Sequence, residues 1–294
     1  MGFKKYEELT FTDDFMFCKV LEQNEELCRE LVELILDTKI EIVKGVRRQQ
    51  PIEITPDGRG VRLDVRMEGD DTIYELEMQN GHRAELPKRA RYYQALTDLD
   101  LMERGAKYTE LQDSVLIFIC TFDPLGRGRS RYIVKRTVED EPDLPYNDGA
   151  RIVYLSALPG RKDELSDGLR AFLDYVGGEA PHSELTRRVD EAIRRARSQR
   201  EWRKEYMLLS EIRDEGREEG RAEGLAEGRE EGRAEGLAEG REEGLTEGRE
   251  IEREYLIRRI AGNGKSAEEI AEMTGLPLDT VLRMISSDDG SAQE

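Results

Sequence analysis

The chain has 294 residues and a formal charge of −19, with three cysteines and two histidines. Scattered cysteines and so few imidazoles argue against a disulfide framework, a structural zinc site and histidine-based catalysis, and the acidic total argues against a general nucleic-acid coat protein. No apolar run approaches the about 20 residues of a membrane span, and the N-terminus lacks the apolar core of a signal peptide, so we expect a cytoplasmic protein without membrane contact.

The first expected elements are two helical pieces over residues 12–37, where apolar residues recur near helical spacing. A strand over residues 40–50 follows. Residues 61–80 then read VRLDVRMEGDDTIYELEMQN. Apolar and polar residues alternate strictly on both sides of residues 68–71, a stretch with turn chemistry, which predicts an antiparallel hairpin.

The polar face of this hairpin carries Asp64, Glu75, Glu77 and Gln79. If the loop has two residues, 70 and 71, Asp64 lies opposite Glu77. If the loop has four residues, 68–71, Asp64 lies opposite Glu75. Both registers keep the acids on one face, because directly paired residues point the same way.

Carboxylates that face each other across a strand pair repel, so this face needs a neutralising partner. One interpretation is a solvated face of an ordinary hairpin, with Arg62 and Arg66 as partners. The other is a hard divalent cation such as Mg²⁺, which proteins hold by one or two carboxylates. The hairpin alone leaves both interpretations open.

A helix over residues 85–105, closed by Gly105, follows the hairpin at once. Around its start the chain carries four cations: Arg83, Lys88, Arg89 and Arg91. Carboxylates for a metal ion beside cations for phosphates form the layout of a metal-dependent phosphodiesterase.

Residues 114–122, SVLIFICTF, form a continuous apolar run, which is typical of a strand buried on both faces. Strands at 130–136 and 150–158 and a helix near 162–176 follow. The order of elements describes an α/β domain with a mixed sheet flanked by helices, which we expect to cover residues 1–180.

From residue 183 the pattern changes to a long charged helix and then to a repeat, in which nine glycines recur every fourth residue from 216 to 248. Residues 211–250 hold 15 acids and 7 arginines, a balance of −8. Each glycine costs a helix about 0.8–1 kcal/mol relative to alanine. We therefore favour a weakly helical, low-complexity spacer over residues 181–255; the alternative is a rod in which small residues let two copies pack together.

The last segment, 256–294, is expected to hold two short helices. Ser266 and Glu269 form a capping box, Gly275 ends the first helix and Pro277 begins the second. The layout is that of a helix-turn-helix. The second helix offers a single arginine, Arg283, for contacts to bases in the major groove of DNA, so a small helical cap or protein-contact unit is favoured.

Four stretches together resemble the recombination-promoting nuclease (Rpn) family, also described as PD-(D/E)XK nuclease family transposases: LDV at 63–65, YELEMQ at 74–79, PKRARYYQAL at 87–96 and SVLIFICTF at 114–122. The resemblance covers roughly residues 6–180, and the repeat and helical tail are also similar to tails in that family. It implies a restriction-endonuclease-like core and cleavage of DNA that depends on Mg²⁺ or Mn²⁺. The label transposase by itself does not imply strand transfer.

Residue by residue, the resemblance makes Asp64 and Glu77 the metal ligands and places Gln79 where the wider superfamily has lysine. An amide cannot act as a base. Lys88 is therefore a candidate for the missing cation, and Gln79→Lys is expected to retain activity.

The resemblance also extends to the first helix and to the basic helix. Asp14 is similar to an acidic position on the first helix, and Glu75 is a possible extra metal ligand. Arg89 and Tyr93 look like the family's basic-helix positions, so the expected DNA-contacting residues are Arg83, Lys88, Arg89, Arg91 and Tyr93.

The function favoured by these observations is a Mg²⁺-dependent DNA endonuclease linked to recombination or mobile elements. Because two single-strand cuts are made most simply by a symmetric pair, we expect a homodimer or a higher homo-oligomer. One alternative, motivated by Gln79, is a degenerate nuclease fold that binds DNA or a protein without cutting. Another is a structural oligomer built on the glycine repeat.

Overall fold

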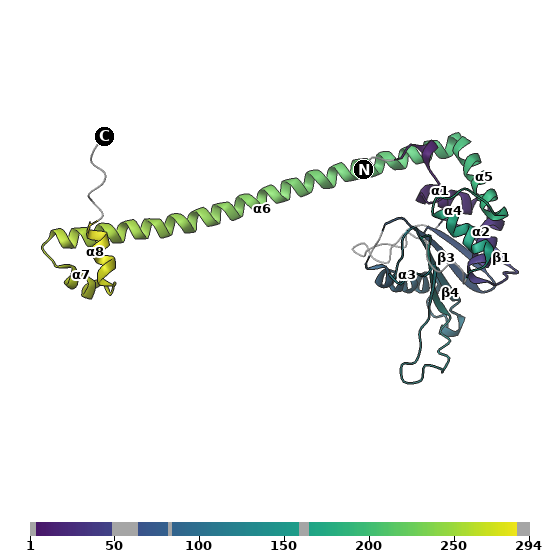
Figure 1. Ribbon diagram of the computed structural model, residues 1–294, viewed down its shortest axis with the longest axis horizontal. Coiled ribbons are helices and arrows are strands. Elements are labelled where there is room, and N and C mark those ends of the chain that lie inside the picture. Colours follow the sequence, from purple (N-terminus) through teal and green to yellow (C-terminus); the bar gives the residue numbers. More distant parts are fainter. Residues whose placement is uncertain (1–3, 49–63, 82–83, 159–164, 287–294) are drawn as a thin grey trace. The chain divides into compact units, whose positions relative to one another are not determined.

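Figure 1 shows the computed structural model, which describes residues 4–48, 64–81, 84–158 and 165–286. Contacts divide the chain into two compact units, residues 1–211 and 212–294. No described helix combines the length and the apolar content that crossing a membrane requires.

The first unit is built on one mixed sheet of six strands in the order β1-β2-β3-β4-β6-β5. The central strands β3, β4 and β6 run parallel to one another, and β1, β2 and β5 pair antiparallel with their neighbours. β4 is buried from Ser114 to Cys120, as its continuous apolar run predicts. The strands are β1 (Val43–Arg47), β2 (Val65–Gly69), β3 (Thr72–Gln79), β4 (Asp113–Cys120), β5 (Arg131–Val134) and β6 (Ala150–Ser156).

Helices cover both faces of this sheet (Figure 1). The larger core lies between one face and four helices: α1 (Asp14–Glu22), α2 (Glu25–Leu36), α4 (Asp167–Val176) and α5 (Glu184–Ser198). On the other face, α3 (Leu86–Leu101) packs a smaller apolar cluster against β4 and β6. Two short 3₁₀ helices, η1 (Tyr6–Glu8) and η2 (Tyr108–Glu110), complete the unit. The predicted α/β fold with a mixed sheet between helices is confirmed.

The β2–β3 hairpin has the register predicted for a two-residue loop, with Gly69 paired to Thr72 and Arg66 to Glu75. Its two loop residues have left-handed φ angles of 46° and 57°, which a tight two-residue turn of this kind requires. At Gly69 an added Cβ atom would lie 2.6 Å from the carbonyl oxygen of Ile42. The close approach of that backbone segment therefore requires glycine there.

The first unit extends beyond the boundary predicted at residue 180. α5 buries Val189, Ile193 and Ala196 in the larger core, and the start of α6 (Arg200–Gly262) packs Trp202 and Tyr206 against it. The predicted boundary followed the change to a charged composition. In α5, however, the charges lie on one side of an amphipathic helix whose apolar side still belongs to the core.

The glycine repeat is part of one continuous helix, α6, in place of the weakly helical spacer that the glycine content favoured. Every residue from 211 to 253 is exposed. Most positions between the glycines carry glutamate, arginine, alanine or leucine, which are good helix formers. Glycine lowers the stability of a helix but does not obstruct its geometry, so the helical formers set the conformation.

The second unit has a small core of its own, in which the end of α6 packs with α7 (Ala267–Thr274) and α8 (Leu278–Ser286). Its buried residues are Ile257, Ile270 and Val281. The predicted capping box of Ser266 and Glu269 is present, and Gly275 ends α7 with a left-handed φ of 67°. The predicted two-helix tail is confirmed as structure, and its function as a cap or contact unit stays a prediction.

Candidate active site

The polar row of β3 lies on the sheet face that α3 covers. Its side chains alternate with apolar residues of β3 that join the larger core on the opposite face. Glu75 and Glu77 are each 1% exposed, and Gln79 is 7% exposed. The face is therefore buried, and the interpretation of this hairpin as a solvated surface is wrong.

Asp64 and Glu77 are held together through main-chain hydrogen bonds. The amide of Asp64 donates to Glu77 Oε1 over 2.9 Å, and the amide of Met78 donates to Asp64 Oδ2 over 2.9 Å. Burial, and then the charge of Asp64, raise the pKa of Glu77 well above its usual range. Two carboxylates fixed this close, one half-buried and one buried, favour binding of a cation.

Arg89 of α3 contacts Glu77 of this pair. Its Nη1 donates to Gln79 Oε1 over 3.0 Å, and its Nη2 lies 3.4 Å from Glu77 Oε2. Its Nε donates to the hydroxyl of Tyr93, and its Cζ lies 4.8 Å from the centre of that ring. Gln79 Nε2 donates to Glu77 Oε2 over 3.3 Å, which closes the network.

Glu75, the possible extra metal ligand, belongs to a second network. Its partner on α3 is Thr97, one helical turn beyond Tyr93. The hydroxyl of Thr97 donates to Glu75 Oε1 over 2.6 Å, and Arg66 lies 3.4 Å from the same oxygen. Arg66 also bonds Asp100 over 2.7 Å. Arg66 is thus the partner of Glu75, as the solvated-face interpretation proposed, but in a buried position.

Thr97 and Asp100 are absent from the predicted set. Arg89, Tyr93 and Thr97 follow one another at intervals of four residues, so they share one side of α3. That spacing was the available signal for Thr97. It becomes informative only once the helix is known to cover the polar row of β3.

Burial raises the pKa of Glu75 to about 7, because desolvation outweighs the opposing effects of Thr97 and Arg66. The unfolded chain has a value near 4.3, so the folded state binds this proton more tightly and is stabilised by it at low pH. As the pH rises from about 4 to about 8, we expect wild type to lose about 3 to 4 kcal/mol of stability relative to Glu75→Gln. Urea denaturation of both proteins in metal-free buffer measures this difference. Parallel pH dependences for the two proteins would contradict it.

The cations predicted along the basic helix occupy different environments. Lys88 and Arg91 are exposed on α3, whereas the side chain of Arg89 is 24% exposed and lies within the network. The cation beside Gln79 is therefore Arg89, in the place for which sequence suggested Lys88. Arg83 lies outside the described residues.

Asp14 is exposed at the first position of α1. The side chain of Asn80, directly after Gln79, donates to the carbonyl of Thr12. The segment before α1 therefore meets the end of β3, which places Asp14 near this end of the strand.

The Asp64–Glu77 pair has the chemistry of a site for a hard divalent cation. Mg²⁺ prefers oxygen ligands and is commonly held by one or two carboxylates, with waters completing its shell. Within the described ranges, no group of three or more histidine, cysteine, aspartate or glutamate side chains is placed to hold a metal ion. The residues present therefore fit a Mg²⁺-type site and do not form a cage made only of protein ligands.

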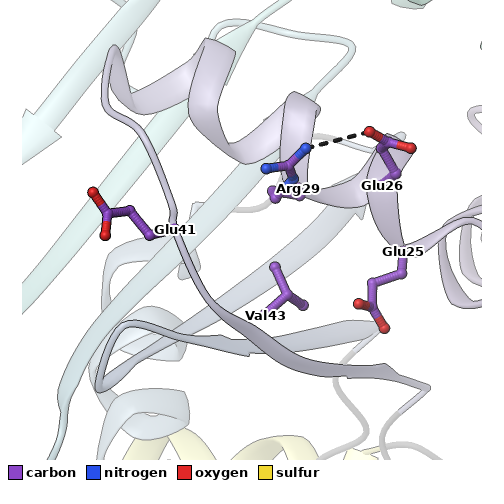
Figure 2. Close-up of a pocket in the computed structure, with 5 residues that line it drawn as sticks. All are labelled: Glu25, Glu26, Arg29, Glu41 and Val43. Carbon is purple, nitrogen blue, oxygen red and sulfur yellow. Dashed lines mark hydrogen bonds and ion pairs between the residues drawn. The ribbon is translucent and has the colours of Figure 1, made fainter.

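A separate cavity of about 210 Å³ lies at the start of α2 (Figure 2). It is lined by Glu25, Glu26, Arg29, Glu41 and Val43, and Arg29 pairs with Glu26 over 3.3 Å. The cavity shares no residue with the network around Glu77 and contains no predicted site residue.

The mixed sheet between helices, with an aspartate–glutamate pair on its β2–β3 hairpin, defines a restriction-endonuclease-like α/β fold. The model of one family, described as PD-(D/E)XK nuclease family transposase, matches residues 11–165. The chain belongs to this family, which confirms the resemblance seen in the sequence. The match supports a nuclease or mobile-element role. Searches of curated proteins and of solved structures returned no match.

Proposed function

We propose that this protein is a divalent-metal-dependent DNA endonuclease whose active site is the Asp64–Glu77 pair. The observation that carries the proposal is the fixed pairing of half-buried Asp64 with buried Glu77 through main-chain amides, near the start of α3, where Lys88 and Arg91 are exposed. Membership of a nuclease family supports the same reaction class. The preferred ion is Mg²⁺, with Mn²⁺ as a substitute.

In this proposal Asp64 and Glu77 hold the ion through their carboxylate oxygens. When bound, the ion would polarise a phosphoryl oxygen and lower the pKa of the attacking water. Gln79 carries no charge and its amide cannot accept a proton from that water, so its part is to orient neighbouring groups. Lys88 and Arg91 contact flanking phosphates, which positions the DNA strand without reading its sequence.

The test is nicking of supercoiled plasmid by the full-length chain, with and without Mg²⁺ or Mn²⁺. Wild type is expected to nick only with the ion, and Asp64→Asn to lose this activity, because the amide still accepts from Met78 but has no charge for the ion. Asp143→Asn, an exposed aspartate in the loop after β5, is the matched control. Absence of metal-dependent nicking by wild type, or full activity of Asp64→Asn, would sink the proposal.

A second candidate function is binding of DNA without cleavage. It is favoured by Gln79, which stands where the wider PD-(D/E)XK superfamily has lysine, and by the pairing of Arg89 with Glu77. The exposed pair Lys88→Glu and Arg91→Glu would then abolish a metal-independent interaction with duplex DNA, measured by fluorescence anisotropy. DNA binding of this kind, together with no nicking under any metal condition, would establish this function in place of the first.

A further inference from the structure

The guanidinium of Arg89 is fixed by more partners than charge neutralisation of Glu77 needs. Gln79 accepts from Nη1, and Tyr93 accepts from Nε and places its ring beside the guanidinium. Tyr93 is itself 6% exposed and packs against Phe118 of β4, with ring centres 6.4 Å apart. The orientation of Arg89 therefore survives when its contact with Glu77 is lost.

A guanidinium presents five donors in a rigid fork and suits phosphate recognition. Here Nη1 donates to Gln79 and Nε donates to Tyr93, and Nη2 lies 3.4 Å from Glu77 Oε2. If an ion takes over that carboxylate, Nη2 of Arg89 loses its partner and its donors become available beside the pair. A phosphate group of the DNA at this pair could then accept from Nη2.

Gln79 is complementary to this arrangement. Its carbonyl oxygen accepts from Arg89 and its amino group donates to Glu77. The PD-(D/E)XK motif of the wider superfamily has lysine at this position, two residues after the second acid. In this chain a lysine there would set an ammonium group against the guanidinium, so the glutamine belongs with a cation that comes from the helix.

Resting on the endonuclease function above, we propose that Arg89 is a catalytic residue that contacts the scissile phosphate. Gln79 and Tyr93 are its positioning residues. Arg89 stabilises the negative charge that develops on the phosphoryl oxygens during cleavage, and it supplies from α3 the cation that a lysine at position 79 would supply from β3. The alternative is that Arg89 is only a counterion for Glu77, which the metal ion displaces.

Arg89→Gln separates these roles. It is expected to lower kcat for plasmid nicking about 100-fold with little change in KM, and Mn²⁺ affinity by isothermal titration should not weaken, because a cation beside Glu77 has been removed. In Ca²⁺, which permits binding without turnover, the salt dependence of duplex binding should fall by about one charge.

A displaced counterion instead predicts unchanged kcat with tighter Mn²⁺ binding, and a flanking DNA contact predicts a change in KM alone. Either result overturns the proposal.

The reciprocal swap guards against a variant that merely misfolds. Gln79→Lys combined with Arg89→Gln returns one cation and one amide to the site from the opposite elements. We expect it to nick at least tenfold faster than Arg89→Gln alone, while a failure to recover with an unchanged melting temperature would contradict a cation role for Arg89. Wild type that does not nick would reject the endonuclease function as well, whereas active wild type matched by Arg89→Gln rejects this inference only.

Discussion

Glu77→Gln is expected to lose divalent-metal binding and DNA cleavage together while the protein remains folded. The amide keeps the shape of the side chain and an oxygen that can accept from the amide of Asp64. It lacks the charge that offsets a divalent ion, so we expect Mn²⁺ affinity to fall at least about 100-fold. Because burial and Asp64 already raise the pKa of Glu77, a neutral group at this position should cost the fold little.

Glu75→Gln is the matched control for this experiment, since Glu75 lies on the same strand, on the same face, with the same 1% exposure. Its partners are Arg66 and Thr97, so we expect its Mn²⁺ titration and its nicking rate to stay close to those of wild type. Equal losses in both variants would make Glu75 the extra ligand that the sequence suggested. Metal binding and cleavage by Glu77→Gln at the wild-type level would leave the acids with a structural role alone.

The hairpin shows what the sequence could settle. Strict alternation fixes which residues share a face in either register. The sequence left the loop open between two and four residues, and the structure shows the two-residue turn, with Asp70 and Asp71 at left-handed φ angles. The face of Glu75, Glu77 and Gln79 was therefore predictable. The environment of this face was not predictable, because the same alternation of residues occurs whether water or the polar side of a helix covers the face.

The contacts that could not be predicted from the sequence are those between α3 and the polar row of β3. The side of α3 toward β3 carries Arg89, Tyr93 and Thr97, whereas Leu86, Ala90 and Leu96 pack in the apolar cluster with β4 and β6. The apolar spacing predicts a helix that packs on the sheet, but it does not show which polar side chains of that helix meet the polar row of β3. The end of α3 was also misplaced. The helix stops at Leu101 with Met102 in extended conformation, and Gly105 takes its positive φ in the loop beyond instead of serving as the C-cap.

The predicted bounds of the two units followed the amino-acid composition too closely. Charge density marked the end of the first domain at residue 180 and a spacer after it, yet α5 contributes buried residues to the larger core and α6 continues through the glycines. A high content of charged residues describes the positions that face solvent. It does not show whether the backbone is helical, because an amphipathic helix such as α5 and a fully exposed helix such as α6 can both be rich in charge.

Gln79→Ala should slow DNA cleavage about 10- to 100-fold while leaving Mn²⁺ affinity within about twofold of wild type. The truncation removes the acceptor of Arg89 Nη1 and the donor to Glu77 Oε2, but no charge. Nicking kinetics and isothermal titration on the same preparation separate the two effects. A loss of metal affinity as large as that of Glu77→Gln would instead make the amide oxygen a metal ligand.

Gln79→Lys alone, which the family resemblance predicts to remain active, is expected from the structure to lose activity. A lysine at this position would place its ammonium group against the guanidinium of Arg89 in a place where Gln79 is only 7% exposed, so the two cations would be poorly screened. One of them must move, and either movement breaks the contacts that orient Arg89 toward the carboxylate pair. Nicking assays and a melting curve of this single variant check the expectation. Wild-type activity in Gln79→Lys would show that the site accepts a cation from β3 without giving up the one on α3.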